Sequence, residues 1–265
     1  MKNNIRIYDQ NHSIKAELAG ETEESGVILA WEGCYEEGDQ ILFQVAAPNE
    51  FYVIQADDSM GEAYVYMTQS ELTYTIPFGE KKTSYNPKAF DGERHYLTLR
   101  KAFPWELGYR NLAVNPLDQH GEHGCYPHAL ANVETRGEAV FAARNAIDGV
   151  CANRSHGQWP YESWGINRQD DAELTLEFGR AVDFDQIVLY TRADFPHDNW
   201  WEQVTFTFSD GTSETAALKK QYEPHVLPIT RKGITWLKLG KLIKADDPSP
   251  FPALTQIQVY GTEAK

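Results

Sequence analysis

Hydrophobic and polar residues alternate along most of this chain, and apolar positions with helical spacing are almost absent. Successive side chains on a β-strand point to opposite faces, so this alternation predicts strands with one face on a core. Seven such runs precede residue 103, and Gly, Asp, Asn and Pro separate them. They are SIKAEL, GVILAW, DQILFQVAA, EFYVIQA, EAYVYMTQ, ELTYTIP and RHYLTLRKA. Because strands at this spacing bury their apolar faces in two packed layers, we predict a β-sandwich.

The alternation fades between residues 103 and 137, where three Pro and repeated Gly and His interrupt it. Such a stretch is typical of a connection between two domains. We therefore predict an N-terminal β-sandwich domain over residues 1–105 and a second β-domain over residues 106–265.

Five further alternating segments follow this connection. They are AELTLEFG, DQIVLYTRA, QVTFTFSDGTSETAAL, GITWLKLGKL and LTQIQVYG. In the first, Leu174, Leu176 and Phe178 share one face, which indicates a strand packed on a core. Asp210 and Gly211 tolerate positive φ, so they predict a tight hairpin. The segment EAVFAARNAIDG predicts a helical turn, and the fold class predicted for the chain is all-β, with two β-sandwiches.

The second domain also carries a series of short motifs. They are NLA at residues 111–113, AARNAIDG at 142–149, a Trp-bearing loop, LTLEFG at 174–179, DQIVLYTR at 185–192 and IQVYG at 257–261. Over roughly residues 109–261, their order and spacing resembles the galactose-binding-like family, also called the discoidin or coagulation factor type C family. The resemblance implies an eight-stranded jelly roll whose loops at one end bind a sugar, a phospholipid head group or a protein. The fold alone does not decide among these ligands.

The same resemblance implies a structural calcium ion beside the AIDG turn. In the family, backbone carbonyls, an Asp of this turn and an acidic residue at the start of the last strand hold the ion. Asp148 matches the first carboxylate, whereas Gln256 stands at the second position and offers a neutral amide oxygen. Calcium affinity falls as carboxylates are lost, so a turn in which Asp148 caps its own loop backbone is the alternative. No other cofactor is implied.

Composition and charge narrow the range of partners. The 265 residues are 42% hydrophobic and 12% aromatic, which is enough to build cores. The net charge of −15 repels nucleic-acid phosphates and anionic lipids but is indifferent to neutral sugars. No apolar run of about 18 residues is present, and MKNNIRIYDQ lacks the apolar segment of a signal peptide. We therefore expect no nucleic-acid partner, no membrane span and a cytoplasmic location.

Cysteines and histidines are the residues that could form cross-links or metal sites in this chain. Three scattered cysteines do not make a disulfide framework, although one bridge between Cys125 and Cys151 is the alternative. The segment DQHGEHGCYPH contains several metal-ligand types, but their spacing matches no closed zinc pattern. We interpret it as a polar connection between domains, with a transition-metal site as the alternative. Its candidate ligands are Asp118, His120, Glu122, His123, Cys125 and His128.

Two connections in the second domain concentrate aromatic and polar side chains. RADFPHDNWW lies between two predicted strands, and HGQWPYESWGINRQDD precedes the strand AELTLEFG. A pyranose packs its apolar CH face on an indole, and its hydroxyls bond to Arg, Asp, Asn or His. If both loops lie at one end of the sandwich, they form the walls of a shallow sugar-binding cleft. The candidate ligand-binding residues are Trp159, Tyr161, Trp164, Arg168, Arg192, Asp194, His197, Asp198, Trp200 and Trp201.

A structural role and a catalytic role are the alternatives for these loops. Adjacent residues of a strand face opposite ways, so one of Trp200 and Trp201 is expected in the core. Arg192 can pair with Asp194 or Asp198 to brace its loop. Glycoside hydrolysis needs two carboxylates about 5–9 Å apart across a cleft, and Asp194 and Asp198 are the nearest candidates.

Together, these patterns predict a non-catalytic protein that binds a neutral carbohydrate through loops at one end of its C-terminal sandwich. The alternatives are a carbohydrate-active enzyme, either a glycoside hydrolase or a lyase, and a protein-interaction or assembly module. The first domain carries no comparable cluster, so the sequence leaves its role open.

Overall fold

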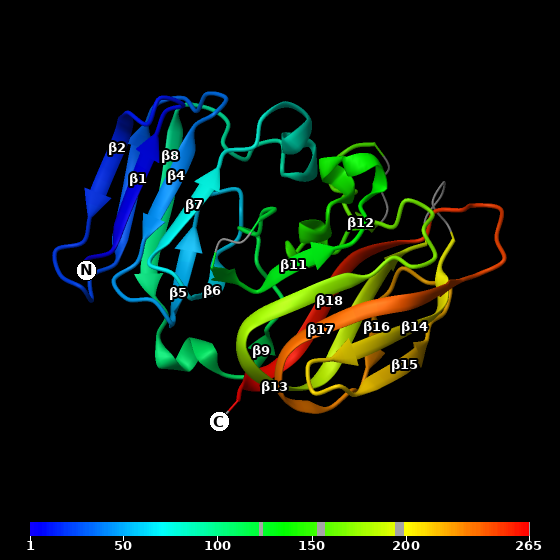
Figure 1. The fold of residues 1–265 in the computed structure, drawn as a ribbon. Helices are drawn as coiled ribbons and strands as arrows, with labels where there is room; N and C mark the ends of the chain where they lie inside the picture. Colours follow the sequence, from blue (N-terminus) through cyan, green and yellow to red (C-terminus); the bar gives the residue numbers. More distant parts are fainter. Residues whose placement is uncertain (122–123, 153–156, 194–198, 265) are drawn as a thin grey trace.

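The computed structural model describes residues 1–121, 124–152, 157–193 and 199–264. Two β-domains lie side by side, the N-terminal one at the left and the C-terminal one at the right of Figure 1. The all-β prediction is confirmed. Helical structure in the described residues consists of short 3-10 helices, none long and apolar enough to cross a membrane. They are η1 (Gly79–Ser84), η2 (Pro104–Leu107), η3 (Thr135–Gly137), η4 (Ala139–Phe141) and η5 (Ala143–Ile147).

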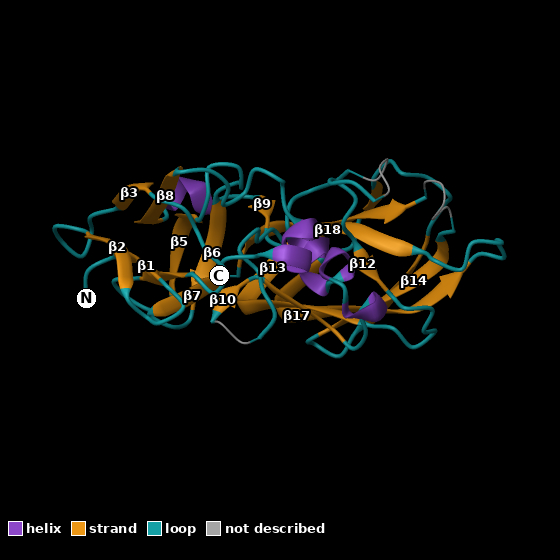
Figure 2. Ribbon diagram, turned by 90° about the horizontal axis from the view of Figure 1, so that it is seen from above, coloured by secondary structure: helices purple, strands orange, loops and turns teal. Residues whose placement is uncertain are grey.

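The N-terminal domain is a sandwich of two antiparallel sheets, seen edge-on in Figure 2. One sheet has the order β2 (Ile14–Ala19), β1 (Asn4–Tyr8), β4 (Gln40–Gln44), β7 (Glu71–Thr75). The other has the order β10 (Cys125–Tyr126), β6 (Ala63–Met67), β5 (Glu50–Gln55), β8 (Arg94–Lys101), β3 (Val27–Glu32). The seven predicted strands are all present.

The strand β1 was not predicted from the sequence, yet it is central to its sheet, between β2 and β4. Its side chains Ile5 and Ile7 are fully buried and pack in one cluster with Phe43 of β4 and with Val65 and Leu97 of the opposite sheet. Burying each such side chain contributes roughly 1.5–3 kcal/mol, so β1 is a substantial part of this core.

The C-terminal domain is one continuous sheet that curls into two layers. Along the sheet, the order is β12 (Trp164–Gly165), β18 (Ala253–Glu263), β13 (Leu174–Arg192), β17 (Arg231–Lys244), β14 (Trp201–Phe208), β15 (Ser213–Ala217). Beside this path, β11 (His128–Ala131) and β16 (His225–Leu227) pair with β13, and β9 (Arg110–Asn111) pairs with β18.

The 19-residue strand β13 joins two segments that the sequence predicted as separate strands. It pairs with β17 from Leu174 to Phe184 and with β18 from Val182 to Arg192. At the register break of the β17 pairing, between Glu177 and Val182, Gly179 has a φ of 70°, a left-handed conformation that favours glycine. The strand therefore bends and passes from one layer to the other, as its curved course in Figure 1 shows.

Local predictions for the second domain are confirmed in two places. Leu174, Leu176 and Phe178 are fully buried in its core. At the Asp210 and Gly211 turn, the backbone N–H of Phe208 donates to the carbonyl of Thr212 at 2.9 Å and closes the hairpin.

The segment after the predicted boundary returns to the first domain before it enters the second. Leu117 and Cys125 belong to the N-terminal core, and β10 adds a strand to the sheet of β6. The side-chain amide of Gln119 bonds to both backbone groups of Thr75, at 3.1 and 2.8 Å. The connection thus packs the two domains together. All three cysteines are free, so the alternative of a bridge from Cys125 to Cys151 is not observed.

Candidate functional site

The end of β13 and the segment before β12, which belong to the two predicted aromatic loops, lie together at one end of the C-terminal sandwich. Arg192, the last residue of β13, is 1% exposed, and its guanidinium donates to the backbone carbonyl of Tyr161 at 2.5 Å. This bond joins the end of β13 to the segment before β12. Three predicted ligand residues of the first loop, Asp194, His197 and Asp198, lie outside the described residues.

Two of the predicted indoles are wrong as ligand contacts. Trp164 and Trp201 are fully buried in the core, with their ring centroids 6.4 Å apart. The indole N–H of Trp164 is satisfied internally by the carbonyl of Val133 at 2.9 Å. A ligand in solvent cannot reach either ring. The physical reason is that both residues start strands at inward-facing positions, where a large apolar ring fills the sandwich interior.

Trp200 points away from the core, as strand alternation requires beside the buried Trp201. It is partly buried, and the ammonium of Lys220 lies 5.1 Å from its ring centroid. Trp200 does not line either of the two hollows described next.

A cavity of about 290 Å³, called here the end cavity, opens at the same end of the C-terminal sandwich. Its volume is near the lower limit of the roughly 300–1,000 Å³ typical of small-molecule sites. Two predicted residues, Arg168 and Arg192, line it. The other lining residues are Thr135, Arg136, Phe141, Ser163, Gly165, Ile166, Asn167, Phe251, Pro252 and Ala253.

Arg168 is one of two exposed arginines that line this cavity. Asn167 and Arg168 both have positive φ, 49° and 62°, and the N–H of Asn167 donates to the hydroxyl of Thr135 at 2.9 Å. This turn places the guanidinium of Arg168 4.5 Å from the ring centroid of Phe251. Among the residues that the structure describes, it has no hydrogen-bond or ion-pair partner. Its N–H groups are therefore available to a ligand.

Arg136, the second exposed arginine of the end cavity, differs from Arg168 because its charge has a partner. Arg136 lies 5.5 Å from the ring centroid of Phe141 and forms an ion pair with Glu138 at 2.6 Å. Sequence reasoning missed Arg136, Phe141 and Phe251, because they come from segments far from the two aromatic loops. Phe251, flanked by prolines in a loop before the last strand, was the one that composition could have indicated.

The other two predicted aromatics face the first domain. Trp159 and Tyr161 are partly buried and line a hollow of about 420 Å³, called here the interdomain groove. Its opposite wall comes from the N-terminal domain. The wall consists of Gly79, Lys82, Thr83, Tyr85 and Pro87. The predicted ligand residues are thus divided between two neighbouring hollows.

The geometry at Asp148 and Gln256 does not fit a calcium ion. The side-chain N–H₂ of Gln256 donates to the carbonyl of Asn145 at 2.5 Å and to Oδ1 of Asp148 at 2.7 Å. Its Oε1 accepts from the N–H of Gly149 at 3.1 Å. The expected amide oxygen is therefore turned away, and a hydrogen-bond donor faces the two oxygens that would serve as ligands. Burial raises the pKa of Asp148 to about 8, against the opposing charge of Arg144.

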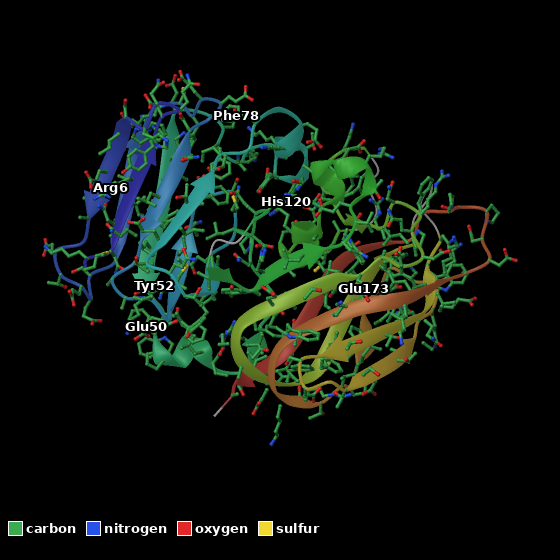
Figure 3. All side chains as sticks on the ribbon, viewed as in Figure 1. Arg6, Glu50, Tyr52, Phe78, His120 and Glu173 are labelled. Atoms are coloured by element: carbon green, nitrogen blue, oxygen red, sulfur yellow. The ribbon has the colours of Figure 1, made fainter. Side chains whose placement is uncertain are left out.

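The candidate metal ligands of DQHGEHGCYPH separate in the fold. His128 bonds to Asp118 at 2.6 Å in a buried pair. The pKa of His128 is raised, because the lowering by burial is outweighed by the hydrogen bond and charge of Asp118 together with the charge of Glu177. His120 lies between the domains and bonds to Glu134 at 2.9 Å, which raises the pKa of His120 (Figure 3). Cys125 is in the N-terminal core, while Glu122 and His123 lie outside the described residues. Within the described part of the chain, no three such donors are gathered for a metal.

No family model matches the chain, and no curated protein matches its sequence. Several solved structures are similar to part of it. The lectin domain of lectinolysin complexed with Lewis B antigen has a TM-score of 0.42 at 14% identity, covering 58% of this chain and 97% of its own. Chitosan-binding module 1 of the chitosanase/glucanase from Paenibacillus sp. IK-5 has a TM-score of 0.40 at 16% identity, covering 57% of this chain and 99% of its own.

The family 32 CBM from C. perfringens NanJ in complex with galactose has a TM-score of 0.38 at 16% identity, covering 50% of this chain and 91% of its own. These similar structures are carbohydrate-binding modules with the galactose-binding-like fold, the family that the motifs of the second domain resemble. The sugars named for these structures are ligands of those proteins, and at 14–16% identity they are not assigned to this chain.

Proposed function

We propose that this chain is a carbohydrate-binding protein whose C-terminal domain holds a neutral sugar in the end cavity. The observation that carries the proposal is Arg168, whose guanidinium has no ion-pair partner among the described residues and lies over the ring of Phe251 at the mouth of a small, mainly apolar hollow. A pyranose offers both complements, because its CH face packs on apolar surface and its hydroxyls accept hydrogen bonds.

The charges around the cavity favour a neutral ligand. Arg136 is neutralised by Glu138, and Arg192 is buried with its guanidinium bonded to Tyr161. One free guanidinium remains, on a chain with a net charge of −15 that repels polyanions at long range. A small and open site of this kind supports modest affinity, because water already satisfies the hydroxyls of the free sugar.

The described lining of the end cavity contains no carboxylate. A glycosidase needs two acids at the bond that it cleaves, and the predicted pair, Asp194 and Asp198, lies outside the described residues. The proposal is therefore one of sugar binding, and catalysis by this pair is the alternative to be tested. Measuring new reducing ends on the glycans that bind separates this proposal from the enzymatic alternative.

Isothermal titration calorimetry with a panel of neutral monosaccharides tests the proposal. We expect Arg168→Ala to weaken binding about five- to tenfold, the value of one or two lost hydrogen bonds. Arg231→Ala is a matched control, because Arg231 also lies 4.5 Å from a phenyl ring, that of Phe208, but outside the cavity. If no sugar binds the wild type, or if Arg168→Ala binds as tightly as Arg231→Ala, the proposal is wrong.

A further inference from the structure

The interdomain groove and the end cavity are linked by a hydrogen bond between a lining residue of each, Tyr161 and Arg192. We propose that the groove binds the next units of the same saccharide, so that the N-terminal domain supplies one wall of an extended binding surface. This inference rests on the proposed function and adds a role for the first domain.

Tyr161 connects the two hollows. Its side chain lines the groove, while its backbone carbonyl accepts the hydrogen bond from Arg192, which lines the end cavity. The two hollows are therefore neighbours, and in this proposal a saccharide seated in the end cavity extends past Tyr161 to reach the groove.

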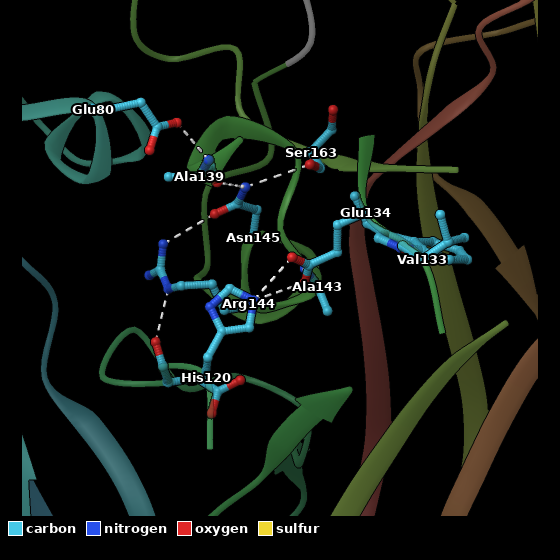
Figure 4. A network of polar contacts seen from close by, with 11 residues as sticks. Glu80, His120, Val133, Glu134, Ala139, Ala143, Arg144, Asn145 and Ser163 are labelled. Carbon is cyan, nitrogen blue, oxygen red and sulfur yellow. Dashed lines mark hydrogen bonds and ion pairs between the residues drawn. The ribbon is translucent and has the colours of Figure 1, made fainter. Parts of the chain in front are cut away.

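The walls of the groove are held by contacts between the domains. Glu80 of η1 accepts a hydrogen bond from the backbone N–H of Ala139 in η4 at 2.7 Å (Figure 4). Tyr85 is 8% exposed, and the guanidinium of Arg144 lies 4.4 Å from its ring centroid. Arg144 is itself fixed by donating to the carbonyl of Asp118 at 2.8 Å. A wall held on both sides loses little freedom when a ligand binds, which favours affinity.

The groove has the surface types that a sugar chain needs. Trp159, Tyr161 and Tyr85 give it aromatic surface, and Lys82 and Thr83 add polar groups on the opposite wall. The ammonium of Lys82 has no acidic partner within ion-pair distance among the described residues. Three free N–H donors beside aromatic rings suit hydroxyl groups on a pyranose.

Chain-length dependence of affinity tests the inference. The probe is the neutral monosaccharide found to bind the end cavity, compared with its linear oligosaccharides of increasing length, each titrated by calorimetry. For the wild type, we expect affinity to rise with length. We expect Lys82→Ala to bind the longer oligosaccharides about fivefold more weakly than the wild type does, which is the value of one hydrogen bond. We expect its affinity for the monosaccharide to be unchanged. Lys88→Ala is the matched control, because Lys88 is an exposed lysine near the groove that does not line it.

A second measurement does not depend on a variant. Amide NMR shifts of Lys82 and Thr83 should change with the oligosaccharide and stay unchanged with the monosaccharide. If the monosaccharide binds but affinity does not rise with length, or if Lys82→Ala matches Lys88→Ala, the inference is wrong and the proposed function stands. If neither monosaccharide nor oligosaccharide binds, the proposed function is wrong and the inference falls with it.

Discussion

The contacts of Gln256 make a sharp prediction about metal dependence. In the wild type, its amide N–H₂ already bonds to the carbonyl of Asn145 and the carboxyl of Asp148. Because these oxygens are satisfied by a donor of the chain itself, we expect calcium to leave the stability of the wild type unchanged. We expect Gln256→Glu to reverse this behaviour, because it replaces the donor by a second carboxylate.

The magnitude follows from the bonds that the change removes. Two buried hydrogen bonds are lost, at about 1 kcal/mol each, and oxygens left facing one another without a donor cost about 1–3 kcal/mol more. We therefore expect Gln256→Glu to lose about 3–5 kcal/mol of unfolding free energy in a calcium-free buffer. Two carboxylates and the Asn145 carbonyl are hard oxygen ligands, so calcium at about 100 times its Kd would return about 2.7 kcal/mol.

Urea unfolding above pH 8 is the assay, because Asp148, with its pKa of about 8, is then charged. Each protein is measured in EDTA and in millimolar calcium. Gln258→Glu is the control, since Gln258 lies on the same strand but is partly exposed. The reasoning is refuted if calcium stabilises the wild type, or if Gln256→Glu in EDTA is as stable as the wild type.

Two further predictions concern the core and the interface. We expect Trp201→Ala to lose about 3–5 kcal/mol of unfolding free energy, because it empties a fully buried site. We expect Trp200→Ala to lose under about 1 kcal/mol. Equal losses of the two variants in chemical denaturation would contradict the orientations of the two side chains. The ion pair with Glu134 lets His120 stabilise the fold below its unfolded pKa of 6.5, and this stabilisation is lost as pH rises through the higher pKa of His120 in the folded protein. The pKa of Glu134 is lowered in the fold, so its contribution to stability is present above its unfolded pKa of 4.5. Denaturation across pH should therefore show His120→Gln less stable than the wild type between pH 4.5 and 6.5 and equal to it well above the folded pKa of His120. The difference should be only about 0.5 kcal/mol, because the His120 side chain is 71% exposed. A constant difference at every pH would exclude this pair as the cause.

The first domain forms one wall of the interdomain groove, although the pattern of its strands carries no functional signal. In the structure, its η1 segment and the residues up to Pro87 form a wall beside Trp159 and Tyr161. A binding surface that spans both domains would explain why the connection between them is packed through Gln119 and Arg144 instead of being a free linker.

The sequence by itself determined where most strands lie and which of their residues face inward. Side-chain direction alternates along a strand whatever its neighbours are, so Leu174, Leu176 and Phe178 could be placed on the core face from the pattern alone. The hairpin at Asp210 and Gly211 was equally local, because two residues that tolerate positive φ are enough to define it. Strand β1 was not predicted, because only Ile5 and Ile7 mark the alternation in this short segment.

Tertiary structure decided everything that depends on which segments meet. Alternation predicted that one of Trp200 and Trp201 is buried, but only the packing against Trp164 selected Trp201. Phe251 reaches Arg168 because β18 and β12 are paired, a contact between distant segments that no local pattern encodes.

The same holds for the polar groups. At Gln256, the residue type left open whether its oxygen or its nitrogen faces Asp148, and the neighbouring N–H of Gly149 settled the orientation. Period and composition act through neighbours in the chain, whereas a binding site is made by neighbours in space, which long-range strand pairing and loop contacts bring together.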